Sequence, residues 1–125
     1  MGQVEVRLLR AAPVLPTADL RVTKDWYERH LGFRAAPEWE KWQYLILHRD
    51  GVGLHFRPHK GPVPEDTGSF YLYVTGDIDA LAARMKADGA DIHDMPQDQP
   101  YGNRDFTAHD PDGRHVMIGK DLEAA

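Results

Sequence analysis

The sequence predicts an α+β fold made of two βαβββ modules, because its main features occur twice in the same order. An apolar strand pattern that leads to an aspartate and a helical pattern occurs at Asp19 and again at Asp77. An Asp-Gly turn then precedes an apolar strand at residues 50–51 and again at 112–113. A stretch rich in proline and glycine, residues 58–68, separates the two copies. One module alone leaves a face of its sheet uncovered, so we expect the pair to form curved mixed sheets round a cleft.

In the first copy, residues 12–16 are expected to form a short strand whose prolines suit a sheet edge or a bend. Asp19 can cap the following helix, and Gly32 can end it. Four residues recur at helical spacing on one face of that helix: Leu20, Thr23, Tyr27 and Leu31. Two strands follow, over residues 42–48 and 52–56.

In the second copy, residues 70–74 are expected to form the first strand, and Asp77 can cap the helix. A short strand over residues 92–95 follows, and strands 106–109 and 115–118 then form a closing hairpin. The sequence Asp-Pro-Asp-Gly between these last strands matches a type I turn, with proline at the first central position.

The chain is expected to be a single domain, residues 1–125, because it is long enough for one core and short for two. Module one takes up about residues 10–57, the linker 58–68, and module two about 69–120. Residues 1–10 are expected to form an extra strand or an arm. Apolar residues alternate with polar ones there, at Val4, Val6 and Leu8.

Composition narrows the functions that the chain can have. It has no cysteine, which excludes disulfides, thiolate zinc sites and cysteine catalysis. No apolar run approaches the roughly 20 residues that span a membrane, and the N-terminus lacks a signal-like apolar core. The net charge of −5 argues against nucleic acid and favours a cationic ligand. We therefore expect a cytoplasmic protein with neither nucleic acid nor membrane as a partner.

The usual catalytic patterns are missing from the sequence. Ser69 is the only serine and lies outside a Gly-x-Ser-x-Gly setting, and no glycine-rich nucleotide-binding motif occurs. Helix capping accounts for Asp19 and Asp77 without a catalytic role. No His-Glu-x-x-His motif occurs in the sequence. His109 and His115 flank a turn and could meet across the hairpin, with a place on the surface or the pocket rim as the alternative.

Four motifs follow one another along the chain: Trp26-Tyr27, Leu31-Gly32-Phe33, Asp77-Ile78-Asp79-Ala80-Leu81 and Asp110-Pro111-Asp112-Gly113. The ordered set resembles the vicinal oxygen chelate superfamily, which includes glyoxalase I, extradiol dioxygenases, fosfomycin-resistance enzymes and bleomycin-resistance proteins. The resemblance covers about residues 12–119, and the segment 99–106 is most similar to the bleomycin-binding branch. It implies the glyoxalase/bleomycin resistance/dihydroxybiphenyl dioxygenase-like fold.

Enzymes of this superfamily hold a divalent metal between the two modules with His, Gln or Glu side chains. The matching positions in this chain are Ala12, His55, Ser69 and Met117. Because only His55 has a suitable side chain, the resemblance implies no metal, no other cofactor and no catalytic residue. We interpret His55 as a pocket histidine satisfied by a neighbouring group.

The bleomycin-resistance proteins sandwich the flat bithiazole of the drug between aromatic side chains, and the matching positions are Trp42, Tyr71 and Tyr101. Aromatic contacts stabilise planar ligands by roughly 0.5–1.5 kcal/mol each beyond area burial. For Trp42 and Tyr71, structural packing is an equal alternative. The full set of expected ligand-binding residues is Trp39, Trp42, His55, Arg57, Tyr71, Tyr101, Gly102 and Met117.

The resemblance thus implies a non-enzymatic protein that binds and sequesters a planar, cationic antibiotic of the bleomycin type and so confers resistance. It also implies a homodimer with two clefts at its interface, sometimes with exchanged N-terminal segments. Two alternatives remain open. One is a metal-dependent enzyme of the same fold, such as a glyoxalase, a dioxygenase or a thiol transferase. The other is a binder of another hydrophobic small molecule.

Overall fold

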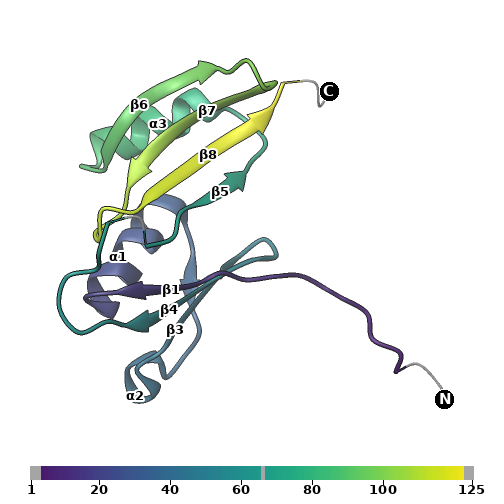
Figure 1. The fold of residues 1–125 in the computed structure, drawn as a ribbon. Helices are drawn as coiled ribbons and strands as arrows, with labels where there is room; N and C mark the ends of the chain where they lie inside the picture. The colour runs from purple at the N-terminus through teal and green to yellow at the C-terminus, as the bar shows by residue number, and fades with distance from the viewer. Residues whose placement is uncertain (1–3, 66, 123–125) are drawn as a thin grey trace.

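The computed structural model describes residues 4–65 and 67–122, and each half of the chain forms one four-stranded sheet (Figure 1). The strands of the first half are β1 (Val14–Thr17), β2 (Arg34–Ala35), β3 (Leu45–Arg49) and β4 (Val52–Pro58). Those of the second half are β5 (Phe70–Tyr73), β6 (Asp91–Asp98), β7 (Asn103–His109) and β8 (His115–Asp121). Their orders match, β1-β4-β3-β2 and β5-β8-β7-β6. Each sheet has one parallel pair, β1–β4 or β5–β8, so the predicted duplicated α+β architecture is confirmed.

Helix α1 (Leu20–Leu31) begins and ends where its capping residues predict. The Asp19 carboxylate accepts a hydrogen bond of 3.1 Å from the Val22 amide, and Gly32 follows with a left-handed φ of 68°. The helix packs against the first sheet. Its buried residues are Leu20, Thr23, Tyr27, His30 and Leu31.

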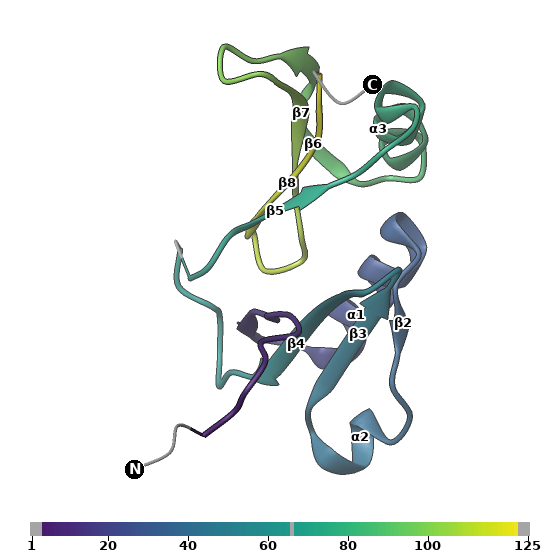
Figure 2. The same cartoon turned by 90° about the vertical axis from the view of Figure 1, so that its right-hand side faces the viewer.

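Helix α3 (Ile78–Ala87) repeats this arrangement in the second half, where the Asp77 carboxylate accepts a hydrogen bond of 3.0 Å from the Ala80 amide. The helix packs against β6 and β7. Figure 2 shows α3 on one side of the second sheet, and the described residues place no helix on the other side. One face of this sheet is therefore left open.

A ring from α1 joins the two halves into one core. Tyr27 is fully buried, and its centroid lies 5.2 Å from that of Phe56 in β4 and 6.4 Å from that of Phe70 in β5. Its hydroxyl donates a hydrogen bond of 2.8 Å to Asp110. Burial, and then the charge of Asp110, raises the pKa of Tyr27 well above its ordinary value. The hydroxyl therefore stays protonated and acts as a donor.

The turn between β7 and β8 completes the junction between the halves. Asp110 also accepts a hydrogen bond of 2.8 Å from the buried guanidinium of Arg114, which donates to the carbonyl oxygen of Pro16 as well. The turn closes as predicted, since the Gly113 amide donates to the Asp110 carbonyl at 2.9 Å. We call Tyr27, Asp110 and Arg114 the inter-module network.

The strand predicted over residues 42–48 begins only at Leu45. Trp42 instead ends a short helix, α2 (Trp39–Trp42). The flanking residues Glu38 and Gln43 have left-handed φ values of 63° and 52°, which are uncommon for residues other than glycine. This backbone geometry is the reason that the strand prediction was wrong at Trp42.

Residues 1–10 were expected to form an extra strand or an arm, and the described part of that segment forms no strand. Residues 4–10 have no regular structure, and residues 1–3 lie outside the described residues. The apolar side chains of the segment are exposed, at Val4, Val6, Leu8 and Leu9. In the second half, β6, β7 and β8 are longer than predicted, and the β7–β8 pairing continues to Asn103 and Asp121. Strand β5 ends one residue earlier than predicted, at Tyr73.

Candidate functional site

The open face of the second sheet carries a group of tyrosines and an aspartate. Along β5 the side chains of Tyr71 and Tyr73 alternate with residues that pack on the core, so they point to the open face. Asp105 of β7 lies on the same face, since both Tyr73 and Asp105 pair with Gly119 of β8. We call Tyr71, Tyr73, Tyr101, Asn103 and Asp105 the tyrosine–aspartate cluster.

Two tyrosine hydroxyls converge on the Asp105 carboxylate. Tyr71 donates a hydrogen bond of 2.9 Å, and Tyr101 donates to the same oxygen. The Asn103 amide donates to the Tyr71 hydroxyl at 3.0 Å. Asp105 is only 8% exposed, whereas Tyr73 is 70% and Tyr101 64% exposed. The cluster therefore presents ring surfaces to the outside above a nearly buried carboxylate.

A glycine in β8 makes this arrangement possible. A Cβ atom at Gly119 would overlap the Tyr71 hydroxyl and would lie 2.8 Å from the Cβ atom of Asp105. Only a residue without a side chain lets the Tyr71 ring cross β8 to reach the carboxylate.

The loop between β6 and β7 holds Tyr101 in place. The Gly102 amide donates to the Gln99 carbonyl at 3.1 Å, and the Gln99 amide donates to the Asn103 carbonyl at 2.7 Å. Gly102 has a φ of 95°, which favours glycine at this position. With its hydroxyl bound to Asp105, the Tyr101 ring is fixed at both ends.

The cluster has the electrostatic character of a cation site. Burial raises the pKa of Tyr71 to about 12, with the hydrogen bond from Asn103 opposing the rise and that to Asp105 adding to it. The hydrogen bond to Asp105 also raises the pKa of Tyr101. Both hydroxyls are therefore neutral at pH 7 and donate to the Asp105 carboxylate. A carboxylate beneath aromatic rings attracts cations through its charge and through the quadrupoles of the rings.

The residues predicted from the first half lie apart from this cluster, on the first sheet and α2. His55 of β4 has its Nδ1 atom 3.0 Å from the Tyr44 hydroxyl, and the two rings meet edge to face. Arg57, two positions along β4, shares the face of His55 and is exposed. Trp42 is 61% exposed.

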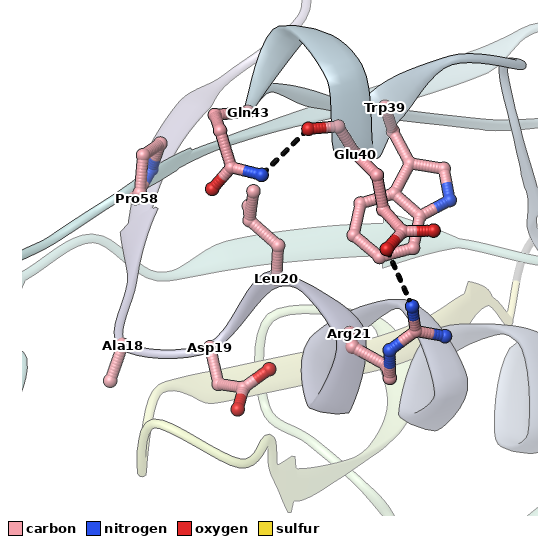
Figure 3. Close-up of a pocket in the computed structure, with 8 residues that line it drawn as sticks. All are labelled: Ala18, Asp19, Leu20, Arg21, Trp39, Glu40, Gln43 and Pro58. Atoms are coloured by element: carbon pink, nitrogen blue, oxygen red, sulfur yellow. Dashed lines mark hydrogen bonds and ion pairs between the residues drawn. The ribbon is translucent and has the colours of Figure 1, made fainter.

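Trp39 lines a small hollow at the N-terminal end of α1 (Figure 3). The Arg21 guanidinium lies 5.2 Å and the Lys24 ammonium 5.9 Å from its ring centroid. Arg21 also forms an ion pair of 2.8 Å with Glu40 (Figure 3). The hollow has a cavity volume of about 290 Å³ and already contains paired charges. It is smaller than most ligand pockets, so we place the candidate site on the second sheet instead.

A larger groove, of about 900 Å³, lies between the two halves of the chain. Its apolar lining comes from both halves: Leu31, Phe33, Val52, Leu72, Val74, Ile78 and Leu81. Tyr73 also lines the groove, and its ring centroid lies 4.7 Å from that of Tyr71. The tyrosine–aspartate cluster and the groove are therefore adjacent at Tyr73, and the groove is of ordinary ligand-binding size.

Of the expected site residues, the structure brings four together: Tyr71, Tyr101, Gly102 and Met117. Met117 of β8 is the strand partner of Tyr71 in β5. The sequence prediction missed Asp105, Asn103 and Tyr73. Alternation along β5 signals that Tyr73 shares the face of Tyr71. No local signal marks Asp105 as a nearly buried carboxylate, because its burial depends on two tyrosines that are distant in the sequence.

Comparison with known proteins identifies the family. The sequence profile of the Glyoxalase/Bleomycin resistance protein/Dioxygenase superfamily matches residues 7–118. This chain belongs to that superfamily, which includes enzymes as well as non-enzymatic binding proteins. No curated protein sequence matches the chain.

Three solved structures illustrate the likeness. A bleomycin resistance determinant encoded on the transposon Tn5 is 28% identical with a TM-score of 0.76, covering 91% of this chain and 98% of its own. A bleomycin-binding protein complexed with bleomycin is 28% identical with a TM-score of 0.75, covering 91% and 99%. TioX from Micromonospora sp. ML1 is 26% identical with a TM-score of 0.73, covering 89% and 97%.

Enzymes of the superfamily hold a metal at four positions. The side chains that this chain has at those positions do not fit a metal ion. Ala12 has no donor atom, Met117 has only a thioether, and Nδ1 of His55 is engaged by Tyr44. In the described conformation, no three His, Cys, Asp or Glu side chains among residues 4–65 and 67–122 are arranged to hold a metal ion. Within the same residues, no helix is long and apolar enough to cross a membrane.

Proposed function

We propose that this protein binds and sequesters a planar, cationic antibiotic of the bleomycin type and confers resistance without modifying it. The observation that carries the proposal is the tyrosine–aspartate cluster, in which exposed rings surround a nearly buried carboxylate. Identity of 28% to a protein described as bleomycin-binding, over 91% of this chain, supports the same ligand class.

In this proposal, Tyr101 and Tyr71 hold the flat part of the ligand, and Asp105 attracts its positive charge. Stacking on each ring stabilises the complex by roughly 0.5–1.5 kcal/mol beyond area burial. Charge attraction is strengthened because Asp105 is largely removed from water. The apolar groove next to Tyr73 accepts a further part of a large ligand.

We further propose that two copies associate and that each cleft lies between them. The exposed apolar side chains of residues 4–10 and the open face of the second sheet favour covering by a partner chain. On this arrangement, Trp42, His55 and Arg57 of one copy face the tyrosine–aspartate cluster of the other. Sedimentation at micromolar concentration should give a dimer. A monomer that still binds the drug would contradict this part of the proposal.

Resistance then follows from mass action in the cytoplasm, since a tightly held drug does not reach its target. The alternative of a metal-dependent enzyme has less support, because the four family positions lack a fitting donor set.

The deciding experiment titrates the purified protein with bleomycin, follows tryptophan and tyrosine fluorescence, and analyses the recovered drug by mass spectrometry. We expect saturable binding and a drug of unchanged mass. A modified drug would support the enzyme, and the absence of binding would favour a different hydrophobic ligand.

A further inference from the structure

Three imidazole rings gather near the β7–β8 turn, on the same face of the second sheet as the tyrosine–aspartate cluster. The ring centroids of His109 and His115 are 4.8 Å apart. The centroid of His93 lies 5.6 Å from that of His109 and 6.5 Å from that of His115. His109 and His115 face each other directly across the antiparallel strands, so their side chains are neighbours by register. We call these residues the histidine triad.

A bulge in β6 brings a carboxylate to the triad. Ile92 pairs with Ala108 and Asp94 pairs with Thr107, so β6 has one residue more than β7 between these pairs. His93 and Asp94 therefore both oppose Thr107. Regular alternation would have turned Asp94 toward the core, whereas the bulge places it on the face of the three rings.

Two aspartates of β6 contact the rings. Asp91 Oδ2 lies 3.2 Å from His109 Nδ1, and Asp94 Oδ2 lies 3.6 Å from His93 Nε2. Histidines that bind metals commonly donate their second ring N–H to a carboxylate, which fixes the tautomer and makes the ligating nitrogen more basic. The Asp91 contact occupies Nδ1 of His109 and leaves its Nε2 atom available.

We propose that His93, His109 and His115 together bind one divalent transition metal ion of the zinc, nickel or copper class. Imidazole nitrogen suits these ions. Metal–nitrogen bonds of about 2.0–2.1 Å place ligating ring centroids roughly 5 Å apart. The separations of 4.8 Å and 5.6 Å from His109 to its two neighbours are close to this value, and the 6.5 Å between His93 and His115 has to shorten. The rings do not yet converge on one point. Binding requires them to turn about their side-chain torsions, and exposed side chains such as His93, 62% exposed, do so within nanoseconds.

This site is separate from the family metal positions and from the proposed drug site. Asp105 and His109 are four residues apart on β7, which is about 13 Å along a strand. Failure of drug binding would therefore leave the metal proposal intact, and failure of metal binding would leave the drug proposal intact.

The test titrates the full chain, without a histidine tag, with zinc chloride and nickel chloride in a calorimeter at about pH 7.5, because metal affinity depends on pH. We expect saturation at one ion per chain. His93→Gln, His109→Gln and His115→Gln should each weaken binding by about tenfold or more. Asp91→Asn should weaken it by about tenfold through the His109 tautomer. Two histidines outside the triad supply matched controls, His48→Gln and His59→Gln, which should leave the affinity unchanged.

Nuclear magnetic resonance distinguishes a defined site from loose association. Substoichiometric nickel should broaden the ring signals of the histidine triad before those of the other histidines. The proposal is overturned if no saturable binding occurs, if the control variants weaken binding as much as the triad variants, or if all histidine signals broaden together.

Discussion

At the scale of single residues, the Tyr101 ring offers the clearest test of the proposed clamp. Its ring is 64% exposed, yet its hydroxyl is anchored on Asp105, so little freedom is lost when a ligand stacks on it. Tyr101→Ala should weaken bleomycin binding by about 1–3 kcal/mol, the range for truncating an important interface aromatic. Tyr101→Trp should bind as well or better because its face is larger. Fluorescence titration measures both affinities.

Tyr101→Phe is the matched control, because it keeps the ring and removes only the bond to Asp105. We expect it to retain most of the stacking and to lose part of the preorganisation. The midpoint of urea unfolding should change little in all three variants. If Tyr101→Ala unfolds the protein while its folded fraction binds normally, the residue is structural and the clamp is wrong.

His30 makes stability depend on pH. The residue is 4% exposed, and its Nδ1 atom has no hydrogen-bond partner among the described residues. Burial, and then the charge of Arg29, lowers the pKa of His30 below its ordinary value. The unfolded chain therefore takes up this proton at a higher pH than the folded protein does. Stability should fall as the pH decreases below about 6.5.

Urea unfolding at several pH values between about 7.5 and 5.5 measures this dependence. His30→Gln removes the titrating group, so the free energy of unfolding should fall less steeply on acidification than in the wild type. The other histidines are common to both proteins and act as an internal control. Equal slopes would show that His30 titrates alike in the folded and unfolded states.

At the scale of elements, β8 carries a glycine on which the cluster depends. Gly119→Ala should displace the Tyr71 ring, because the added Cβ overlaps its hydroxyl. Overpacking of this kind costs about 1–3 kcal/mol of stability. Gly53→Ala in β4 is the matched control, since its nearest contact would be an ordinary 3.6 Å from Ala12. Thermal unfolding and drug titration should both distinguish the variants, and equal behaviour would refute this role of Gly119.

The elements that the sequence predicts well are those with local signals. Helices α1 and α3 each begin directly after a capping aspartate. The carboxylate of that aspartate accepts a hydrogen bond from the amide three residues later. The sequence did not predict helix α2, because Glu38 and Gln43 on either side of it have left-handed φ values that are uncommon for residues other than glycine. The bulge at His93 was not predicted either. It depends on how β6 pairs with β7, and the spacing of apolar residues in the sequence carries no information about that pairing.

The candidate site was predictable only in part. Tyr71 and Tyr101 were expected from the resemblance, whereas the burial of Asp105 arises from contacts across the sheet. For His109 and His115, contact across the hairpin was one of two alternatives, and their ring centroids lie 4.8 Å apart. Their third neighbour, His93, belongs to another strand and had no signal in the sequence.

At the scale of the whole molecule, the inter-module network should set much of the stability. Tyr27→Phe removes a hydrogen bond to a charged acceptor and should cost about 1.5–3 kcal/mol. Asp110→Ala removes the 2.8 Å ion-pair partner of the buried Arg114, leaves only Asp112 at 3.8 Å, and should cost about 3–5 kcal/mol. Tyr44→Phe is the control and should cost about 0.5–1.5 kcal/mol, because its bond to His55 is only partly buried. Urea unfolding measures all three, and a loss for Tyr27→Phe no larger than the control's would contradict the prediction.

The same network makes the duplicated halves unequal. Tyr27 lies eight residues after Asp19, and the residue eight after Asp77 is Met85. Asp110 lies two residues before Asp112, and the residue two before Asp50 is His48. A protein assembled from two second halves would therefore set a buried carboxylate against a thioether, with no hydroxyl to satisfy it. The buried hydroxyl–carboxylate pair therefore needs one residue from each half, and neither half of this chain supplies both.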